Sequence, residues 1–141
     1  MSTRMTRSER EAFLAGLHVG VLSLAEQGWG PLAVPIWYAY DPGGDVRLIT
    51  ERASRKGRLL AVGTRVSLCA QQETVPYRYV TVEGPVASIE PADRDRDLRP
   101  LARRYLGAEH GDRYANENPG EDTVLVRIRP ERWLTVDYGK L

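Results

Sequence analysis

Four cations and a hydroxyl lie close together at residues 52–58 of the segment RLITERASRKGRLL. They are Arg52, Ser54, Arg55, Lys56 and Arg58. The apolar residues before them predict a strand that ends near Thr50, and the leucines after them predict a short helix that begins near Ser54. A strand-to-helix junction gathers free backbone N–H groups and the positive end of a helix dipole. The segment therefore suits a phosphate site, where each charge-assisted hydrogen bond contributes about 1.5 to 3 kcal/mol. The alternative is an ordinary solvated helix start.

Composition narrows the class of protein. The chain has 141 residues with 20 basic and 19 acidic side chains, a net charge of +1. This length suits one domain over residues 1–141, and the weak net charge argues against a nucleic-acid partner. No apolar run approaches the ~20 residues of a membrane helix, so no membrane association is expected. The charged N-terminal segment lacks the apolar run of a secretory signal, which predicts a cytoplasmic location.

The chain offers few metal-binding residues. Cys69 is the only cysteine, so no internal disulfide or paired-cysteine metal site is possible, and we expect a buried, inert thiol. The two histidines, His18 and His110, are interpreted as structural or surface residues. We therefore predict no metal.

Alternating apolar residues and Gly-rich turns predict a mainly β chain. The expected strands are Val19 to Ala25, Leu32 to Tyr40, Val46 to Thr50, Val66 to Gln71, Tyr79 to Ile89 and a last one in TVLVRIRPERW. A first helix is expected from Ser8, as its N-cap, to Leu17, and another from Ala92 to Leu106 that kinks or restarts at Pro100. The segment from Ala108 to Gly120 reads as a polar loop. About six strands in so short a chain favour closure into a barrel, because closure removes exposed edges.

The order of the segments GVLSLA, PLAVPIWYAYD, RLITERASRKGRLL, RVSLCAQ and YRYVTVEGPV resembles a known family. It is similar to the flavin-binding split-barrel family related to pyridoxamine 5'-phosphate oxidase, and within it to the actinobacterial branch that uses the deazaflavin coenzyme F420. The resemblance covers roughly Phe13 to Glu90. It implies a six-stranded antiparallel Greek-key split β-barrel with flanking helices.

The resemblance also implies a cofactor site. The cofactor phosphate is expected on the basic segment, and the ring against the second and third strands, with Gln71 near the ring edge. The implied site residues are Val34, Pro35, Ile36, Trp37, Ile49, Thr50, Arg52, Ser54, Arg55, Lys56, Gln71 and Tyr79. Core packing is the alternative for the apolar residues and Tyr79, and a surface strand end for Gln71. In the family, one segment reaches the cofactor of the other protomer or lines the substrate cavity, and it resembles Tyr77, Arg78 and Tyr79 here. The resemblance therefore implies a homodimer with sites at the interface.

The implied activity is hydride transfer from a reduced cofactor to an unsaturated small organic substrate. We expect F420 rather than FMN, because the negatively charged tail of F420 needs the additional arginines of the basic segment. An FMN-dependent oxidoreductase and a non-catalytic flavin-binding or storage protein are the alternatives, and a protein-interaction domain with an empty barrel is a third. No catalytic residue is predicted; Tyr77, Tyr79 or solvent would deliver the accompanying proton.

Overall fold

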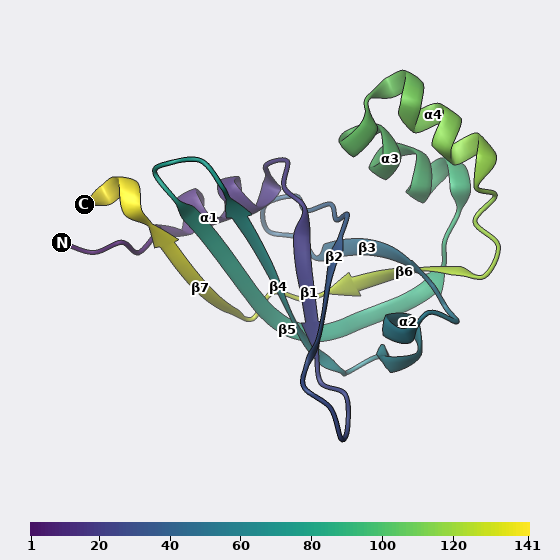
Figure 1. Cartoon of the computed structure of the whole chain (residues 1–141), viewed down its shortest axis with the longest axis horizontal. Coiled ribbons are helices and arrows are strands. Elements are labelled where there is room, and N and C mark those ends of the chain that lie inside the picture. Colours follow the sequence, from purple (N-terminus) through teal and green to yellow (C-terminus); the bar gives the residue numbers. More distant parts are fainter.

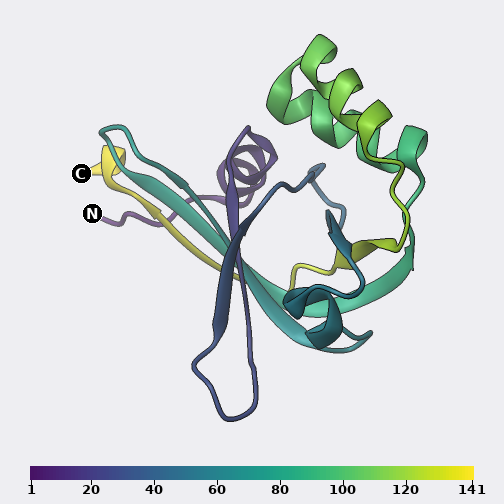
Figure 2. The same ribbon diagram turned by 45° about the vertical axis from the view of Figure 1, so that its right-hand side comes forward.

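Seven antiparallel strands form the body of the protein. The computed structural model describes residues 1–141. The strands are β1 (Gly20–Leu24), β2 (Leu32–Ile36), β3 (Val46–Glu51), β4 (Arg65–Gln72), β5 (Arg78–Pro91), β6 (Thr123–Ile128) and β7 (Arg132–Asp137). Their order is β2-β1-β4-β5-β6-β3. The first half of β5 pairs with β4 along one edge and with β7 along the opposite edge. The sheet curls around an apolar interior (Figures 1 and 2), which confirms the predicted mainly β split barrel.

Strand alternation explains the core. Successive side chains of a strand point to opposite faces, and β3 and β4 bury every second residue. The inward side chains form one cluster, to which α1 (Arg7–Ala15) contributes the fully buried Leu14. The outward face of β1 and β4 carries Val21 and Cys69, which lie directly opposite each other. Cys69 is only half-buried there, so the prediction of a buried thiol was wrong.

The predicted last strand is two strands. It breaks after Ile128, and the chain crosses β5 at Gly84 before β7 begins. The N–H of Arg129 donates to the carbonyl of Pro85, and a Cβ on Gly84 would lie 1.7 Å from the Arg129 carbonyl oxygen. Only a glycine permits this approach, and Pro130 cannot donate to a ladder. The expected six strands therefore become seven.

The helices are α1, α2 (Arg55–Leu59), a π-helical turn η1 (Arg94–Leu98), α3 (Arg99–Leu106), α4 (Ala108–Glu117) and a 3₁₀ turn η2 (Tyr138–Lys140). Helix α1 starts earlier than expected, because Thr6 and Glu9 form a reciprocal capping box and Ser8 does not cap it. Ser54 caps α2, as predicted. Pro100 lies in the first turn of α3, which confirms a restart there.

Helix α4 replaces most of the loop predicted from Ala108 to Gly120. It forms an antiparallel hairpin with α3 that projects from one side of the barrel (Figure 2). Gly111 is buried against the backbone of Arg103, where a Cβ would lie 2.6 Å from its Cα. Asp112 accepts hydrogen bonds from Arg103 and Arg99, and these lower the pKa of its carboxyl group. No helix of the protein is both long and apolar enough to cross a membrane.

Candidate functional site

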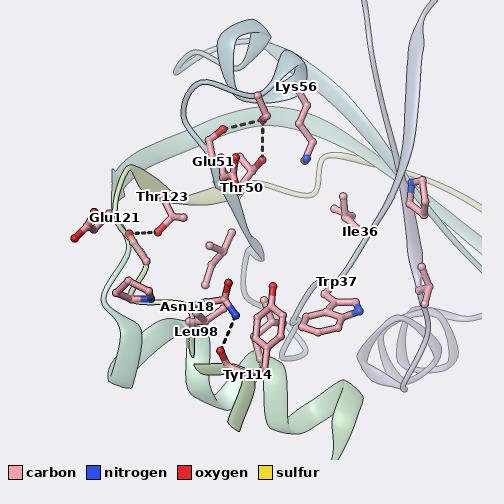
Figure 3. Close-up of a pocket in the computed structure, with 17 residues that line it drawn as sticks. Ile36, Trp37, Thr50, Glu51, Lys56, Leu98, Tyr114, Asn118, Glu121 and Thr123 are labelled. Atoms are coloured by element: carbon pink, nitrogen blue, oxygen red, sulfur yellow. Dashed lines mark hydrogen bonds between the residues drawn. The ribbon is translucent and has the colours of Figure 1, made fainter. Parts of the chain in front are cut away.

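A cavity of about 800 Å³ lies between the α3–α4 hairpin and the ends of β2 and β3. Its size suits a small-molecule or cofactor site. Figure 3 shows Lys56, Glu51 and Thr50 on one side of it and Trp37, Tyr114 and Leu98 on the other. The cavity is lined by Val19, Pro35, Ile36, Trp37, Ile49, Thr50, Glu51, Ser54, Lys56, Leu98, Leu101, Tyr114, Asn118, Pro119, Gly120, Glu121 and Thr123.

The polar side is built where β3 passes into α2. The Ser54 hydroxyl donates to the carbonyl of Glu51 at 2.7 Å and accepts from the N–H of Gly57 at 3.1 Å. The Thr50 hydroxyl lies 3.2 Å from that of Ser54 and is buried. Because the one proton of Ser54 goes to Glu51, Thr50 is the donor in its contact with Ser54, and the Thr50 hydroxyl can donate to a bound group only by turning away from Ser54.

Lys56 supplies the only positive charge of the lining. No carboxylate lies within 4 Å of its ammonium group, and the side chain points into the cavity in Figure 3. Helix α2 holds it there because Gly57 packs directly on the strand end, where a Cβ would lie 2.1 Å from the Glu51 carbonyl oxygen. Glu51 and Glu121 also line the cavity but are exposed, so water screens their charges.

The opposite side is apolar and aromatic. Trp37 stacks on Tyr105 with ring centroids 5.2 Å apart and 5° between the planes, and it meets Tyr114 at 5.4 Å in a tilted arrangement. Pro35, Ile36 and Ile49 continue this wall along the two strands. A flat apolar wall facing a cation at the other end suits a planar ring with a charged tail.

Tyr105 fastens the hairpin to the barrel. Its hydroxyl accepts from the backbone N–H of Tyr38 at 3.0 Å and donates to the carbonyl of His18 at 2.6 Å. The guanidinium of Arg104, on the same helix, donates to the carbonyls of Ala15 and Gly16. These contacts set the width of the cavity.

The structure brings together seven of the twelve residues predicted for the site. Pro35, Ile36, Trp37, Ile49, Thr50, Ser54 and Lys56 line the cavity. The other five, Val34, Arg52, Arg55, Gln71 and Tyr79, do not. Val34 packs partly buried against the core, and Arg52 is exposed beside the site.

Arg55 is engaged elsewhere. Its guanidinium forms a bidentate ion pair with Glu26, in the connection between β1 and β2, and the pair includes a hydrogen bond from Nε to Oε1 of 3.0 Å. Hydrogen bonding from Arg55 lowers the pKa of the Glu26 carboxyl group. Its positive charge is therefore matched before any phosphate arrives.

Gln71 and Tyr79 lie opposite each other on β4 and β5, on the outward sheet face. In the next row of that face, Pro35, Val21, Cys69, Thr81 and Leu134 follow one another across β2, β1, β4, β5 and β7. Pro35 also lines the cavity, so the cavity adjoins this face.

Sequence reasoning missed the residues that the helical hairpin contributes. Leu98, Leu101, Tyr114 and Asn118 all line the cavity. A single aromatic residue, Tyr114, in an otherwise polar segment was the one signal available. The two histidines take the roles predicted for them: His18 stacks on Phe13 with its Nε2 3.0 Å from the Phe13 carbonyl oxygen, and His110 is exposed. Burial lowers the pKa of His18.

Solved structures share this fold. The conserved hypothetical protein Rv2991 from Mycobacterium tuberculosis is 25% identical with a TM-score of 0.78, over 99% of this chain and 89% of that one. A protein named F420 reductase is 24% identical with a TM-score of 0.73, over 88% and 94%. An FAD and heme binding protein from Mycobacterium smegmatis is 18% identical with a TM-score of 0.68, over 95% and 72%. No curated protein matches the chain.

The family model described as pyridoxamine 5'-phosphate oxidase matches residues 6–137. This range includes all seven strands and the whole α3–α4 hairpin. The chain therefore belongs to the pyridoxamine 5'-phosphate oxidase family.

Proposed function

We propose that the protein is an oxidoreductase that binds a phosphorylated flavin or deazaflavin in the 800 Å³ cavity. One observation carries the proposal: an unpaired Lys56 and the buried Thr50 hydroxyl face an aromatic wall around Trp37 across that cavity. A phosphate end and a planar ring need such a pair of surfaces. Family membership supports the same class of cofactor.

The donor set fits a flavin-type cofactor. Lys56 would hold the phosphate as a point charge, and the Thr50 hydroxyl would turn from Ser54 to donate a hydrogen bond to it. Pro35, Ile36 and Trp37 would position the ring by apolar contact and exclude water from its face. Ser54 would act through Lys56, because its hydroxyl fixes the first turn of α2.

The cofactor supplies hydride transfer when bound, and the protein supplies position. An unsaturated small organic substrate would lie face-on to the side of the ring that the apolar wall leaves open, where an approach of about 3 to 3.5 Å matters most for rate. Tyr114 is the only phenol that lines the cavity. It replaces Tyr77 and Tyr79 as the candidate proton donor within one protomer, since a phenol O–H can donate a proton to the substrate.

Coenzyme F420 is the cofactor we propose, with FMN as the alternative. The negatively charged tail of F420 needs cations beyond the phosphate site. Arg55 is paired, but Arg52 and Arg58 are exposed and have no carboxylate within 4 Å. These two arginines support F420, and the printed name of one fold neighbour, F420 reductase, is in keeping with it.

We also propose a homodimer with a site at each interface, located in the cytoplasm. The outward sheet face supports the dimer, because Val21 is 38% and Leu134 59% exposed in a row of mostly apolar side chains. Pro35 joins that row to the cavity, so a second protomer on this face would complete the cavity wall. Sedimentation of the wild type and of Leu134→Asp, which measures the oligomeric state, tests this proposal. A monomeric wild type refutes the dimer, and a Leu134→Asp variant that still forms the dimer refutes the outward sheet face as its interface.

Binding titrations of the purified apo-protein with F420 and FMN, followed by fluorescence at fixed ionic strength, test the proposed cofactor. Lys56→Ala should weaken binding by about 1.5 to 3 kcal/mol, or roughly 10- to 150-fold, because one charged hydrogen bond is lost. Lys140→Ala is the matched control, since Lys140 is the only other lysine and pairs with Glu9 away from the cavity. Binding of neither cofactor refutes the proposal, and equal affinities of the Lys56 variant and the wild type remove Lys56 from the site.

Turnover separates the oxidoreductase from the storage protein. A wild-type preparation that binds reduced cofactor but passes no electrons to any unsaturated acceptor would favour the non-catalytic alternative. In that case Tyr114→Phe should bind the cofactor with the same affinity as the wild type and should likewise reduce no acceptor.

A further inference from the structure

A second cavity, of about 470 Å³, lies under α3 on the face of β3 and β6 that points away from the barrel core. It shares only Ile49 and Leu101 with the first cavity. Its lining is Ala39, Tyr40, Asp41, Arg47, Leu48, Ile49, Arg96, Asp97, Pro100, Leu101, Arg104, Leu125 and Arg127. We propose that this cavity binds a small anion through a phosphate or carboxylate group.

The lining carries an excess of positive charge. Its charged side chains are four arginines and two aspartates, which leaves a net charge of +2. The carboxylates are already paired: Asp41 lies 3.2 Å from Arg47, and Asp97 accepts hydrogen bonds of 3.1 and 2.9 Å from Arg96. Arg104 and Arg127 have no carboxylate within 4 Å. The unmatched charge therefore belongs to these two side chains.

Arg127 has an unfavourable neighbour. It lies directly opposite Arg47 in the antiparallel pairing of β3 and β6, so the two guanidinium groups leave the same face of the sheet. Like charges in such cross-strand pairs destabilise a sheet. The guanidinium of Arg127 makes no hydrogen bond and no ion pair, and Asp97 attracts it only from beyond 4 Å. An anion held between Arg47 and Arg127 would remove this repulsion.

One buried donor without a partner belongs to the lining, and a buried hydroxyl without a partner lies next to Arg127 in the sheet. The Nε of Arg104 is buried without a hydrogen-bond partner, although its Nη2 donates to the carbonyls of Ala15 and Gly16. Next to Arg127 on β5, the hydroxyl of Ser88 is also buried without a partner. Buried polar groups normally have partners, so unpaired ones beside a cationic cavity indicate an acceptor that fills it.

The chemistry selects an oxyanion. Planar guanidinium groups bind carboxylate and phosphate oxygens in a bidentate manner, and the volume admits a small ligand. Two sources can supply that group: a free anion, or the anionic end of a molecule whose body lies in the first cavity. The shared wall of Ile49 and Leu101 makes the second source geometrically reasonable.

Titration calorimetry with inorganic phosphate tests the proposal on full-length variants that all carry Lys56→Gln, which removes the cation of the first cavity. The Lys56→Gln protein should bind one phosphate. Adding Arg127→Gln should weaken that binding at least tenfold, as expected for one charge-assisted hydrogen bond. Adding Arg129→Gln should leave it unchanged, since Arg129 is an exposed arginine at the end of the same strand and lies outside the cavity lining.

Absence of saturable phosphate binding in the Lys56→Gln protein overturns the proposal, as does equal affinity of the Arg127 and Arg129 variants. If Arg127→Gln unfolds the chain, Arg47→Gln provides the same test from the facing strand. Competition then distinguishes the sources. Saturating phosphate that weakens F420 binding at least tenfold in both the wild type and Lys56→Gln, but little in Arg127→Gln, identifies the anionic end. Unchanged F420 affinity in Lys56→Gln identifies a free anion. Neither result depends on turnover.

Discussion

Removing one hydroxyl tests how the helical hairpin is fastened to the barrel. In Tyr105→Phe the aromatic ring remains and keeps its parallel stacking on Trp37, at 5.2 Å between centroids. The change deletes the acceptor of the Tyr38 N–H and the donor to the His18 carbonyl, bonds of 3.0 and 2.6 Å. The substitution thus isolates the hydrogen bonds from the packing.

The magnitude follows from what is left unpaired. Tyr38 is fully buried, so water cannot replace the lost partner of its N–H, and an unsatisfied buried group costs about 1 to 3 kcal/mol. The His18 carbonyl is in a half-buried region and loses less. We expect the free energy of unfolding to fall by about 1 to 3 kcal/mol, which corresponds to a decrease in Tm of roughly 3 to 9 °C for a domain of this size.

Urea unfolding followed by circular dichroism measures this change, with Tyr77→Phe as the control. Tyr77 is 53% exposed and its hydroxyl makes no hydrogen bond, so the control should stay within about 0.5 kcal/mol of the wild type. If both variants unfold at the same urea concentration with the same slope, Tyr105 does not anchor the hairpin and the reasoning fails.

Two further substitutions test the crossing of β5 and the chain ends. Gly84→Ala should lower the free energy of unfolding by more than about 2 kcal/mol, because its Cβ would meet the Arg129 carbonyl oxygen at 1.7 Å. Gly30→Ala is the control, since a Cβ there lies in open space, and it should leave the free energy of unfolding unchanged in the same urea assay. The hydrogen bond from Lys140 lowers the pKa of Glu9 from 4.5 to about 2, so its stabilisation is complete above pH 4.5 and is lost as the pH falls through 2. Glu9→Gln should therefore lower Tm at pH 6 but not near pH 2, and a pH-independent difference would contradict this ion-pair account.

The barrel was predictable because its signals are local. Alternating burial along β3 and β4 follows from residue order alone, and so does the capping of α2 by Ser54. The break between β6 and β7 had a local signal in Pro130, which was overlooked. The reason for its position was not local, since it depends on Gly84 in another strand.

The helical side of the cavity was not predictable by the same means. Helix α4 is polar and contains Gly111, which lowers helix propensity. What stabilises it is contact with α3, where Gly111 lies against Arg103. Similarly, the basic segment predicted Arg55 as a phosphate ligand, but in the structure Arg55 pairs with Glu26, which lies 29 residues away in the sequence. Single-sequence reasoning identifies residue types at a site and misses partners that only folding brings together.

The way the hairpin is attached also determines which contacts hold it in place. No backbone hydrogen bond joins α3 or α4 to a strand; side chains such as Tyr105 and Arg104 make the link. Lifting the hairpin would therefore break side-chain contacts, including the hydrogen bonds of Tyr105, but no rung of the sheet. Because α3 lines both cavities, a movement of this hairpin would open both of them at once.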